Sequence, residues 1–290
     1  MLKYYNQIVL DNNIIMSCDM LRLSFSMTES TLTKFNQYIN SLVLKHININ
    51  IKYHTSLQLF QFRNLLQITN LTDSTSFALG LGFNSATNQG KTTCFIEFNP
   101  NKTMSNYFVQ PFLDFIKLHC HNIDVVRYDI AFDIPLPREL FALVKDRRKY
   151  KKIYSLELNN KDMSDFTEYL GVRSNNGYVK LYNKQIESDL DSPLTRLEIT
   201  LDKLEYNNLI AEMPTLNIFT YNERDYSLLN DTERVLLTLL LNSDNTIQYL
   251  NSLGRYMKDK LQPFISDSFP INITESDFYH FITLINKIIR

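Results

Sequence analysis

Residues 177–187, GYVKLYNKQIE, place ionisable side chains at alternate positions of a predicted strand. Successive side chains of a strand point to opposite faces, so the polar side chains share one face and the apolar ones share the other. The polar set is Tyr178, Lys180, Tyr182 and Lys184. A tyrosine held on a strand can attack phosphorus when a nearby metal ion polarises the phosphate. Phosphoryl transfer on a sheet surface is therefore one chemistry that this spacing allows.

Three further predicted strands, within residues 92–100, 125–134 and 194–201, also combine an apolar face with a charged one. Their charged positions include Glu97, Arg127, Asp129, Asp133, Arg196 and Glu198. If the strands are neighbours, the carboxylates converge, and a hard divalent cation such as Mg²⁺ or Mn²⁺ relieves their repulsion. The alternative is an antiparallel sheet whose charged face is only solvated.

Five segments of the chain resemble, in this order, the replication initiation factor family: SCDMLRLSF, FIEFNPNK, RYDIAFDI, YVKLYNKQIE and TRLEITL. That family includes rolling-circle initiators of staphylococcal plasmids and relaxases of integrative elements. The filamentous-phage gene II/X replication proteins and the HUH endonucleases look related. The resemblance covers residues 17–262, and its most specific feature is the order of the motifs.

The resemblance implies a nickase that cuts one strand of a double-strand origin and later rejoins it. The catalytic tyrosine becomes joined to the 5′-phosphate, and the phosphotyrosine bond keeps the energy needed for joining. Carried over by motif, Tyr182 is the nucleophile and Lys184 steadies the charge of the phosphate. The same resemblance assigns the metal ligands, which are Asp129, Asp133, Glu187 and Glu198.

Other residues compete for these roles. Tyr178 points the same way as Tyr182 and is the alternative nucleophile, and Tyr169 is a weaker one. His119 and His121 match the His-hydrophobe-His metal pair of many rolling-circle enzymes. They follow a predicted helix, however, where a histidine also complements the helix dipole.

Basic residues are concentrated in KDRRKYKK, residues 145–152, at the end of a helix predicted over 137–152. This segment is a candidate DNA-contacting surface, and a solvated helix end is the alternative. The predicted DNA-binding residues are Arg147, Arg148, Lys149, Lys151, Lys152 and Arg196. Arg255 and Lys258 form a second, weaker candidate.

The predicted fold class is α+β, with an antiparallel central sheet, flanking helices and two half-units of the Rep and relaxase type. Residues 1–213 are expected to form the catalytic and origin-binding domain, and residues 230–290 a helical C-terminal region. Asn230 with Glu233 predicts a capping box at the start of that region.

Composition limits the remaining classes. Three cysteines without CxxC spacing argue against a disulfide framework and predict a cytoplasmic protein, and the longest apolar run, residues 235–241, is too short to cross a membrane. The expected partner is origin DNA, as a hairpin and a single-stranded nick region; a host helicase and a homodimer stay open, and a membrane is not expected. Two alternative functions remain: a catalytically inactive DNA-binding protein of the same ancestry, and a non-catalytic α+β interaction protein.

Overall fold

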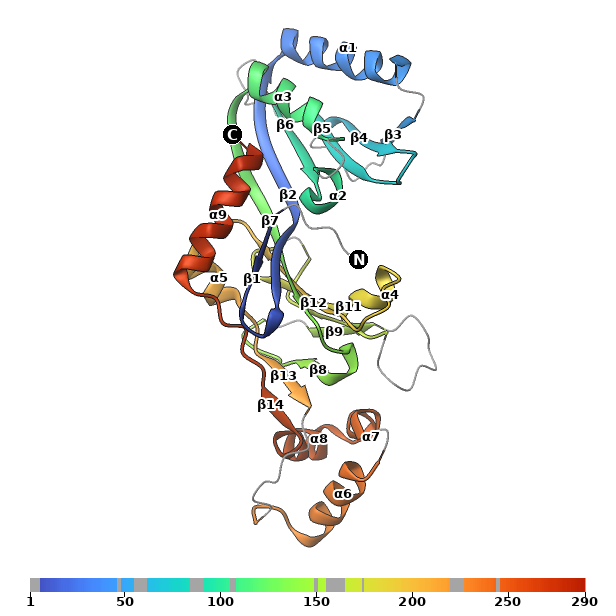
Figure 1. Ribbon diagram of the computed structural model, residues 1–290, viewed down its shortest axis with the longest axis vertical. Coiled ribbons are helices and arrows are strands. Elements are labelled where there is room, and N and C mark those ends of the chain that lie inside the picture. The colour runs from blue at the N-terminus through green and yellow to red at the C-terminus, as the bar shows by residue number, and fades with distance from the viewer. Residues whose placement is uncertain are drawn as a thin grey trace.

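The computed structural model describes residues 6–45, 48–54, 62–83, 91–104, 108–148, 151–154, 165–173, 175–219, 227–243 and 246–289. Within these residues the fold is α+β, as predicted, with one large antiparallel sheet and one small one (Figure 1). The large sheet has the order β3-β4-β5-β6-β2-β7-β12-β11-β10-β9, and β1 pairs with β2. The small sheet has the order β14-β13-β8.

The strands of the large sheet are β1 (Gln7–Val9), β2 (Ile15–Thr28), β3 (Ile49–His54), β4 (Phe62–Asn70), β5 (Ser76–Phe83), β6 (Lys91–Phe98), β7 (His121–Ile134), β9 (Lys151–Tyr154), β10 (Thr167–Leu170), β11 (Tyr178–Asn183) and β12 (Thr195–Leu201). Those of the small sheet are β8 (Phe141–Leu143), β13 (Leu216–Phe219) and β14 (Ser266–Ser268). The helices are α1 (Glu29–Lys45), α2 (Pro100–Thr103), α3 (Gln110–His119), α4 (Lys184–Glu187), α5 (Tyr206–Glu212), α6 (Asp231–Leu241), α7 (Thr246–Ser252), α8 (Arg255–Leu261) and α9 (Glu275–Ile289).

The large sheet consists of two half-units with the same connectivity. In the first, the long strand β2 is followed by β3 to β6, and β6 returns to pair with β2. In the second, β7 is followed by β9 to β12, and β12 returns to pair with β7. The two long strands pair with each other at the centre. The duplicated half-units expected from the sequence are thus present in the strand order.

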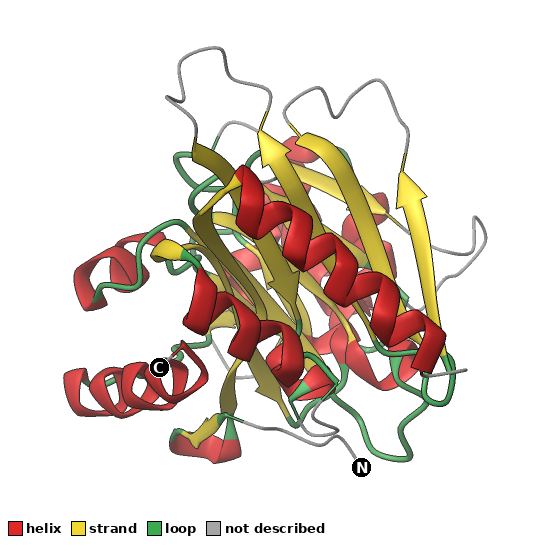
Figure 2. Cartoon of the chain, turned by 90° about the horizontal axis from the view of Figure 1, so that it is seen from above, coloured by secondary structure: helices red, strands yellow, loops and turns green. Residues whose placement is uncertain are grey.

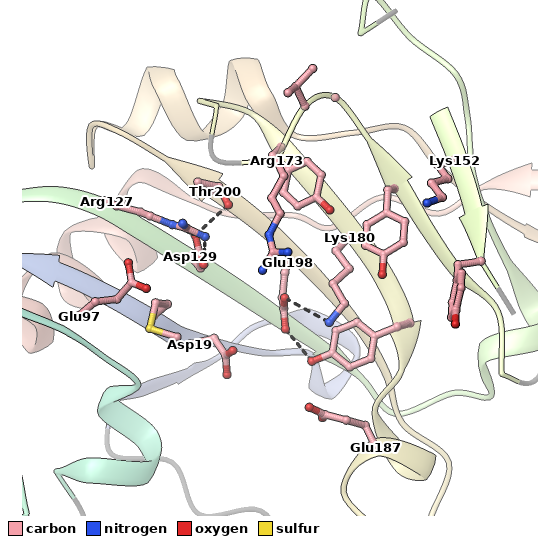
Figure 3. Close-up of a pocket in the computed structure, with 17 residues that line it drawn as sticks. Asp19, Glu97, Arg127, Asp129, Lys152, Arg173, Lys180, Glu187, Glu198 and Thr200 are labelled. Atoms are coloured by element: carbon pink, nitrogen blue, oxygen red, sulfur yellow. Dashed lines mark hydrogen bonds and ion pairs between the residues drawn. The ribbon is translucent and has the colours of Figure 1, made fainter. Parts of the chain in front are cut away.

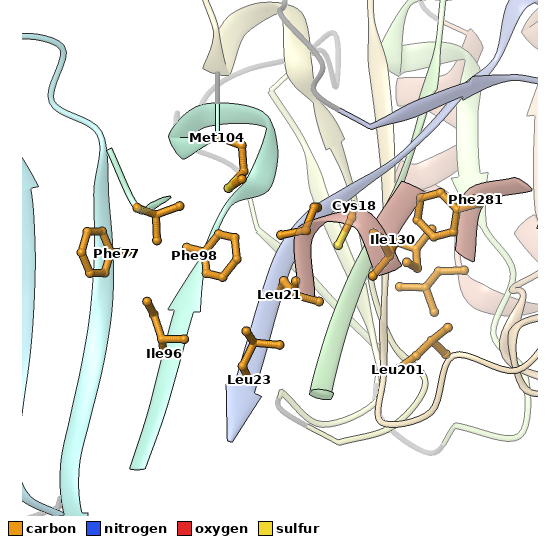
Figure 4. Packing of buried hydrophobic residues seen from close by; sticks show 14 of the residues in the cluster. Cys18, Leu21, Leu23, Phe77, Ile96, Phe98, Met104, Ile130, Leu201 and Phe281 are labelled. Carbon is orange, nitrogen blue, oxygen red and sulfur yellow. The ribbon is translucent and has the colours of Figure 1, made fainter. Parts of the chain in front are cut away.

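One face of the large sheet is apolar and is covered by helices (Figure 2). Phe77, Phe98 and Leu21 stand opposite one another across β5, β6 and β2, and all three are buried (Figure 4). The helices α1, α3 and α9 contribute buried side chains to the same core, including Phe35, Phe112 and Phe281. The opposite face is therefore left to polar side chains.

A β-bulge interrupts the pairing of the two long strands. Cys18 stands opposite Ile130 and Met20 opposite Asp129, so Asp19 has no partner of its own on β7. A bulge inserts an extra residue, bends the strand and re-aims a side chain. Here it turns Asp19 toward the polar face.

The small sheet connects the large one to a separate group of helices. Helices α6, α7 and α8 enclose their own core, which includes Leu237, Leu250 and Leu261, and lie beyond β13 and β14 (Figure 1). The capping box of α6 is present as predicted. Helix α9 instead returns to the main core. The division at residues 213 and 230 stays a prediction, and α9 packs with the first of the two regions.

The prediction of a helix over residues 137–152 is wrong. Arg138–Leu140 form one 3₁₀ turn, β8 follows, and β9 begins at Lys151. Strand β8 pairs with β13 and buries the side chains of Phe141 and Leu143. These long-range contacts override the local helix propensity. No described helix is both long enough and apolar enough to span a bilayer.

Arg138 is fully buried where the two sheets meet. Its guanidinium donates to the carbonyl oxygens of Phe166 and Phe141, and to Glu168 Oε1 at 2.9 Å. The amide of Leu143 donates to the other carboxylate oxygen of Glu168 at 3.1 Å. One ion pair thereby fastens β8 to β10.

Arg138→Ala is expected to lower the free energy of unfolding by about 3–5 kcal/mol, because it removes one partner of a buried ion pair. Urea unfolding measures the loss. Arg147→Ala is the matched control, since Arg147 is 62% exposed in its ion pair with Glu212, and such pairs contribute about 0–1 kcal/mol. Equal losses in the two variants would contradict the assigned role of Arg138.

Candidate active site

Of the four strands that carry the predicted charges, β7, β12 and β11 are direct neighbours, and β2 separates them from β6. Lys180 stands opposite Glu198, and Tyr182 opposite Arg196, across β11 and β12. Strand β7 lies on the other side of β12 and β2 follows it. Their polar side chains line a cleft of about 850 Å³ (Figure 3).

Tyr182 lies in the wall of this cleft and is 5% exposed. Its hydroxyl donates a hydrogen bond to Glu198 Oε1 at 2.6 Å. The Lys180 ammonium lies 3.6 Å from the centre of the Tyr182 ring and 3.9 Å from Glu198 Oε2. Burial, and then the negative charge of Glu198, raises the pKa of Tyr182. The phenol therefore stays protonated at neutral pH and needs an acceptor for its proton.

Glu198 is placed to be that acceptor. Burial, and then the charge of Asp19, raises the pKa of Glu198 above its usual value. A carboxylate whose pKa moves toward neutrality is a better general base than an ordinary surface glutamate. The pair can therefore transfer a proton along its short hydrogen bond.

Asp19 belongs to the site, although the sequence analysis did not assign it a role. It accepts hydrogen bonds from Asn99 Nδ2 at 3.0 Å and from Arg196 Nη1 at 2.7 Å, and it lines the cleft. Its position depends on the bulge in β2, which strict alternation does not reveal. The only signal in the sequence was its place inside the motif SCDMLRLSF.

Arg196 and Asp133 form a buried ion pair below the cleft. The Arg196 Nε–Asp133 Oδ1 distance is 2.5 Å, and the two side chains are 3% and 0% exposed. Burial opposes the charge of Arg196, but the hydrogen bond to Asp133 and the negative charges of Asp19 and Asp133 together outweigh it and raise the pKa of the guanidinium. Neither side chain lines the cleft. The geometry gives them a positioning role, whereas the sequence suggested a DNA contact and a metal ligand.

Asp129 lines the cleft but is already held by other groups. Arg127 donates to both of its carboxylate oxygens, at 3.0 and 2.7 Å, and the Thr200 hydroxyl donates at 2.8 Å. The guanidinium and the hydroxyl occupy lone pairs that a metal ion would need. Asp129 therefore stands apart from Tyr182, in its own hydrogen-bonded cluster.

Glu187 and Lys184 lie on the short helix α4 and pair with each other. Glu187 lines the cleft, whereas Lys184 is 3% exposed and does not. Burial, and then the charge of Arg196, lowers the pKa of Lys184. Burial opposes ionisation of Glu187, but the hydrogen bond from Lys184 and the positive charges of Lys184 and its neighbours together outweigh it and lower the pKa of this carboxyl. Near Tyr182, Lys180 rather than Lys184 is thus the lysine that lines the cleft.

A divalent cation can be accommodated beside Tyr182, but not by all four predicted ligands. Among the described residues, no group of three or more His, Cys, Asp or Glu side chains is arranged to hold a metal ion. Mg²⁺, however, is commonly held by one or two carboxylates together with substrate phosphates. Asp19 fits that role, since it lines the cleft and its described hydrogen bonds, from Asn99 and Arg196, both go to Oδ1.

Of the predicted DNA-binding residues, Lys152 lines the cleft. Arg147 pairs with Glu212, and Arg148 with Asp146, outside the cleft. Lys149 and the side chain of Lys151 lie outside the described residues.

The two histidines also lie away from Tyr182. His119 ends α3, as the helix-end interpretation expects, and its ring packs against Phe115. His121 begins β7 opposite Ser26, seven residues along β2 from Asp19 and so roughly 20 Å away. The His-hydrophobe-His match therefore has no part in this cleft.

The chain is similar to replication initiation proteins of Staphylococcus aureus. One is 26% identical over 194 residues and another 24% identical over 190 residues, with 62% of the chain covered in both cases. The aligned part is 57% and 56% of the length of these relatives. These similarities confirm the resemblance found in the sequence. No protein-family model matches.

A solved structure of a rolling circle replication initiator protein from Geobacillus stearothermophilus aligns with a TM-score of 0.40 and 11% identity. The alignment covers 95% of this chain and 96% of that one.

Glu198→Gln is expected to stabilise the fold above pH 4.5, because it removes a buried charge while keeping an acceptor for Tyr182. The raised folded-state pKa of Glu198 means that ionisation costs stability, so the gain in Tm over the parent should be small near pH 4.5 and increase as pH rises. Thermal unfolding at pH 4, 6 and 8 checks this. Glu97→Gln is the control: it breaks the 2.5 Å ion pair with Arg22 and should give no gain. A Glu198→Gln gain independent of pH would contradict the electrostatic cause.

Proposed function

We propose that this chain initiates rolling-circle replication by nicking origin DNA and rejoining it through a 5′-phosphotyrosine intermediate on Tyr182. The observation that carries the proposal is the hydrogen bond from Tyr182 to Glu198, with Lys180 beside it, in the wall of a polar cleft. The similarity to replication initiation proteins supports origin DNA as the partner. A host helicase and a homodimer remain predictions.

In the proposed reaction the Tyr182 oxygen attacks the scissile phosphorus. A bond forms between this oxygen and phosphorus, and the bond from phosphorus to the 3′-oxygen breaks. The proton of Tyr182 passes to Glu198, and the 3′-oxygen leaves with the bonding electrons and takes a proton from water. Lys180 lies where its charge favours the phenolate. The reverse reaction joins the strand without an external energy source.

We propose Mg²⁺ or Mn²⁺ as the cofactor, which would polarise the scissile phosphate. Asp19 is the residue that would hold it, with phosphate oxygens as further ligands, since Glu198 takes the proton of Tyr182. Arg196 keeps Asp19 in place through its 2.7 Å ion pair. The earlier assignment of Asp129 remains a competing one that experiment can separate.

The burial of Tyr182 favours a second candidate, a DNA-binding protein that does not cut. The side chain is 5% exposed and its pKa is raised, so attack requires the DNA to reach a nearly covered hydroxyl. In this candidate the cleft binds the strand and no covalent bond forms.

Tyr182→Phe is expected to abolish a covalent protein–DNA adduct, because the variant lacks the attacking oxygen. The substrate is a supercoiled plasmid carrying the DNA that surrounds the gene for this chain, incubated with protein and Mn²⁺. Nicking is scored on agarose gels, and the adduct is scored by its retarded migration on denaturing gels.

Tyr178→Phe is the matched control, since Tyr178 lies on the same strand and the same face. Burial, and then the neighbouring Tyr169, raises the pKa of Tyr178 to about 12, and among the described hydrogen bonds Glu198 accepts from Tyr182 and not from Tyr178. Loss of the adduct in Tyr178→Phe alone would reassign the nucleophile. DNA retention without any adduct in the parent protein would favour the binding-only candidate.

Asp19→Asn is expected to weaken Mn²⁺ binding at least tenfold, whereas Asp129→Asn should leave it within about twofold, since a lost charged ligand costs more than about 1.4 kcal/mol. Titration calorimetry in the presence of a short single-stranded oligonucleotide measures the affinity, and the nicking assay gives the Mn²⁺ requirement. The opposite order of the two variants would return the ligand role to Asp129.

A further inference from the structure

Three tyrosines line the cleft on the side of Tyr182 that leads to the sheet edge. They are Tyr178 on β11, Tyr169 on β10 and Tyr154 on the edge strand β9. The mechanism above uses none of them. Their distribution over three consecutive strands makes a row that begins near the nucleophile.

The register shows how the row is built. Tyr169 stands opposite Lys180, two residues from Tyr178, and opposite Lys152, two residues from Tyr154. The rings of Tyr169 and Tyr178 are stacked, with centroids 6.0 Å apart and an interplanar angle of 17°. Tyr154 is 51% exposed. The row therefore presents aromatic surface at diagonal positions across the sheet.

Positive side chains alternate with these rings. Lys152 and Lys180 flank Tyr169 on its two neighbouring strands, and the exposed Arg173 lines the same wall (Figure 3). The other wall of the cleft carries Asp19, Glu97 and Asp129. A phosphate backbone is thus favoured on the tyrosine side, whereas on the other wall Asp129 and Glu97 are paired with Arg127 and Arg22.

We infer that Tyr154, Tyr169 and Tyr178 form a base-stacking platform for single-stranded DNA, which leads the strand from the sheet edge to the site of Tyr182. Aromatic rings interleaved with cations are the usual means of holding an unpaired strand, because each base offers a flat face and each nucleotide a charge. Bases within a duplex are already stacked on one another and leave no face for these rings. The inference rests on the proposed function for its substrate, but it requires no cleavage.

The raised pKa values of two of these phenols are consistent with the role. Burial raises the pKa of Tyr169, and burial with the adjacent Tyr169 raises that of Tyr178 to about 12. Both hydroxyls therefore stay uncharged at physiological pH and do not repel phosphate. The simpler explanation, cross-strand packing that stabilises the sheet edge, accounts for the stacked pair but not for the half-exposed Tyr154.

The test measures binding of a fluorescent single-stranded oligonucleotide by anisotropy, in a Tyr182→Phe background that prevents covalent trapping. Tyr154→Leu and Tyr169→Leu should each weaken binding about 5- to 100-fold, because each removes a stacking face. The Phe variants at the same positions should bind within about twofold, because they keep the ring. Tyr279→Leu, at a 57% exposed tyrosine on α9, is the matched control and should have no effect.

Abasic substitutions in the oligonucleotide provide a second readout that a purely structural role would not move. An abasic nucleotide at a position that contacts the platform should weaken binding to the parent protein. The same abasic oligonucleotide should bind Tyr169→Leu almost as well as the intact oligonucleotide does, because the stacking contact is already lost in that variant. Equal binding by parent and Leu variants, with their folding confirmed by unchanged Tm, would overturn the platform. Equal losses with a duplex of the same sequence would also overturn it, and a stronger effect with RNA would reassign its ligand.

The two proposals fail separately. If the parent forms no covalent adduct but the Leu variants lose single-stranded binding, the platform stands and the nicking reaction does not. If the adduct forms and depends on Tyr182 while the Leu variants bind normally, nicking stands and the platform does not.

Discussion

The arrangement of the cleft depends on one buried cation, the guanidinium of Arg196. From β12 it reaches Asp133 on β7 and Asp19 on β2, so a single side chain ties together three strands across both half-units. Removing one partner of such a buried pair leaves a charge without compensation, at a cost of about 3–5 kcal/mol. Arg196 also stands opposite Tyr182. The Arg196 guanidinium that ties the three strands together therefore also holds Asp19, the residue at the bulge, near the phenol of Tyr182.

This cation also explains how several carboxylates can share one small region. Asp133 is neutralised by Arg196, Glu187 by Lys184 and Asp129 by Arg127. Glu198 has only the more distant Lys180, at 3.9 Å, and its pKa is raised. The charge of the site is thus least compensated at Glu198, which accepts the hydrogen bond of Tyr182, and at Asp19, which shares Arg196 with Asp133. A proton and a divalent cation are the species that these two carboxylates attract.

The alternation of apolar and polar residues within 125–134, 177–184 and 194–201 predicted the polar face, because alternation along a strand can be read without knowing which strands pair with it. It did not predict what depends on a distant partner. Phe141 and Leu143 form a strand because β13, more than seventy residues later, pairs with them, so the helix expected there is absent. Asp19 enters the cleft through a bulge that exists only against β7. The alternation of polar and apolar residues likewise could not show that the side chains of Asp133 and Arg196 are buried.

The duplicated connectivity raises the question of why the proposed nucleophile lies in the second half-unit. In the first, Glu97 on β6 faces Arg22 and Ala78, where Glu198 on β12 faces Ala131 and Lys180. Gly80 on β5 has no side chain, and a Cβ there would lie 2.1 Å from the ring of Phe95, which also packs under Arg22. A nucleophile at this position would displace that ring. In the first half-unit the ring of Phe95 therefore fills the position that Tyr182 takes in the second.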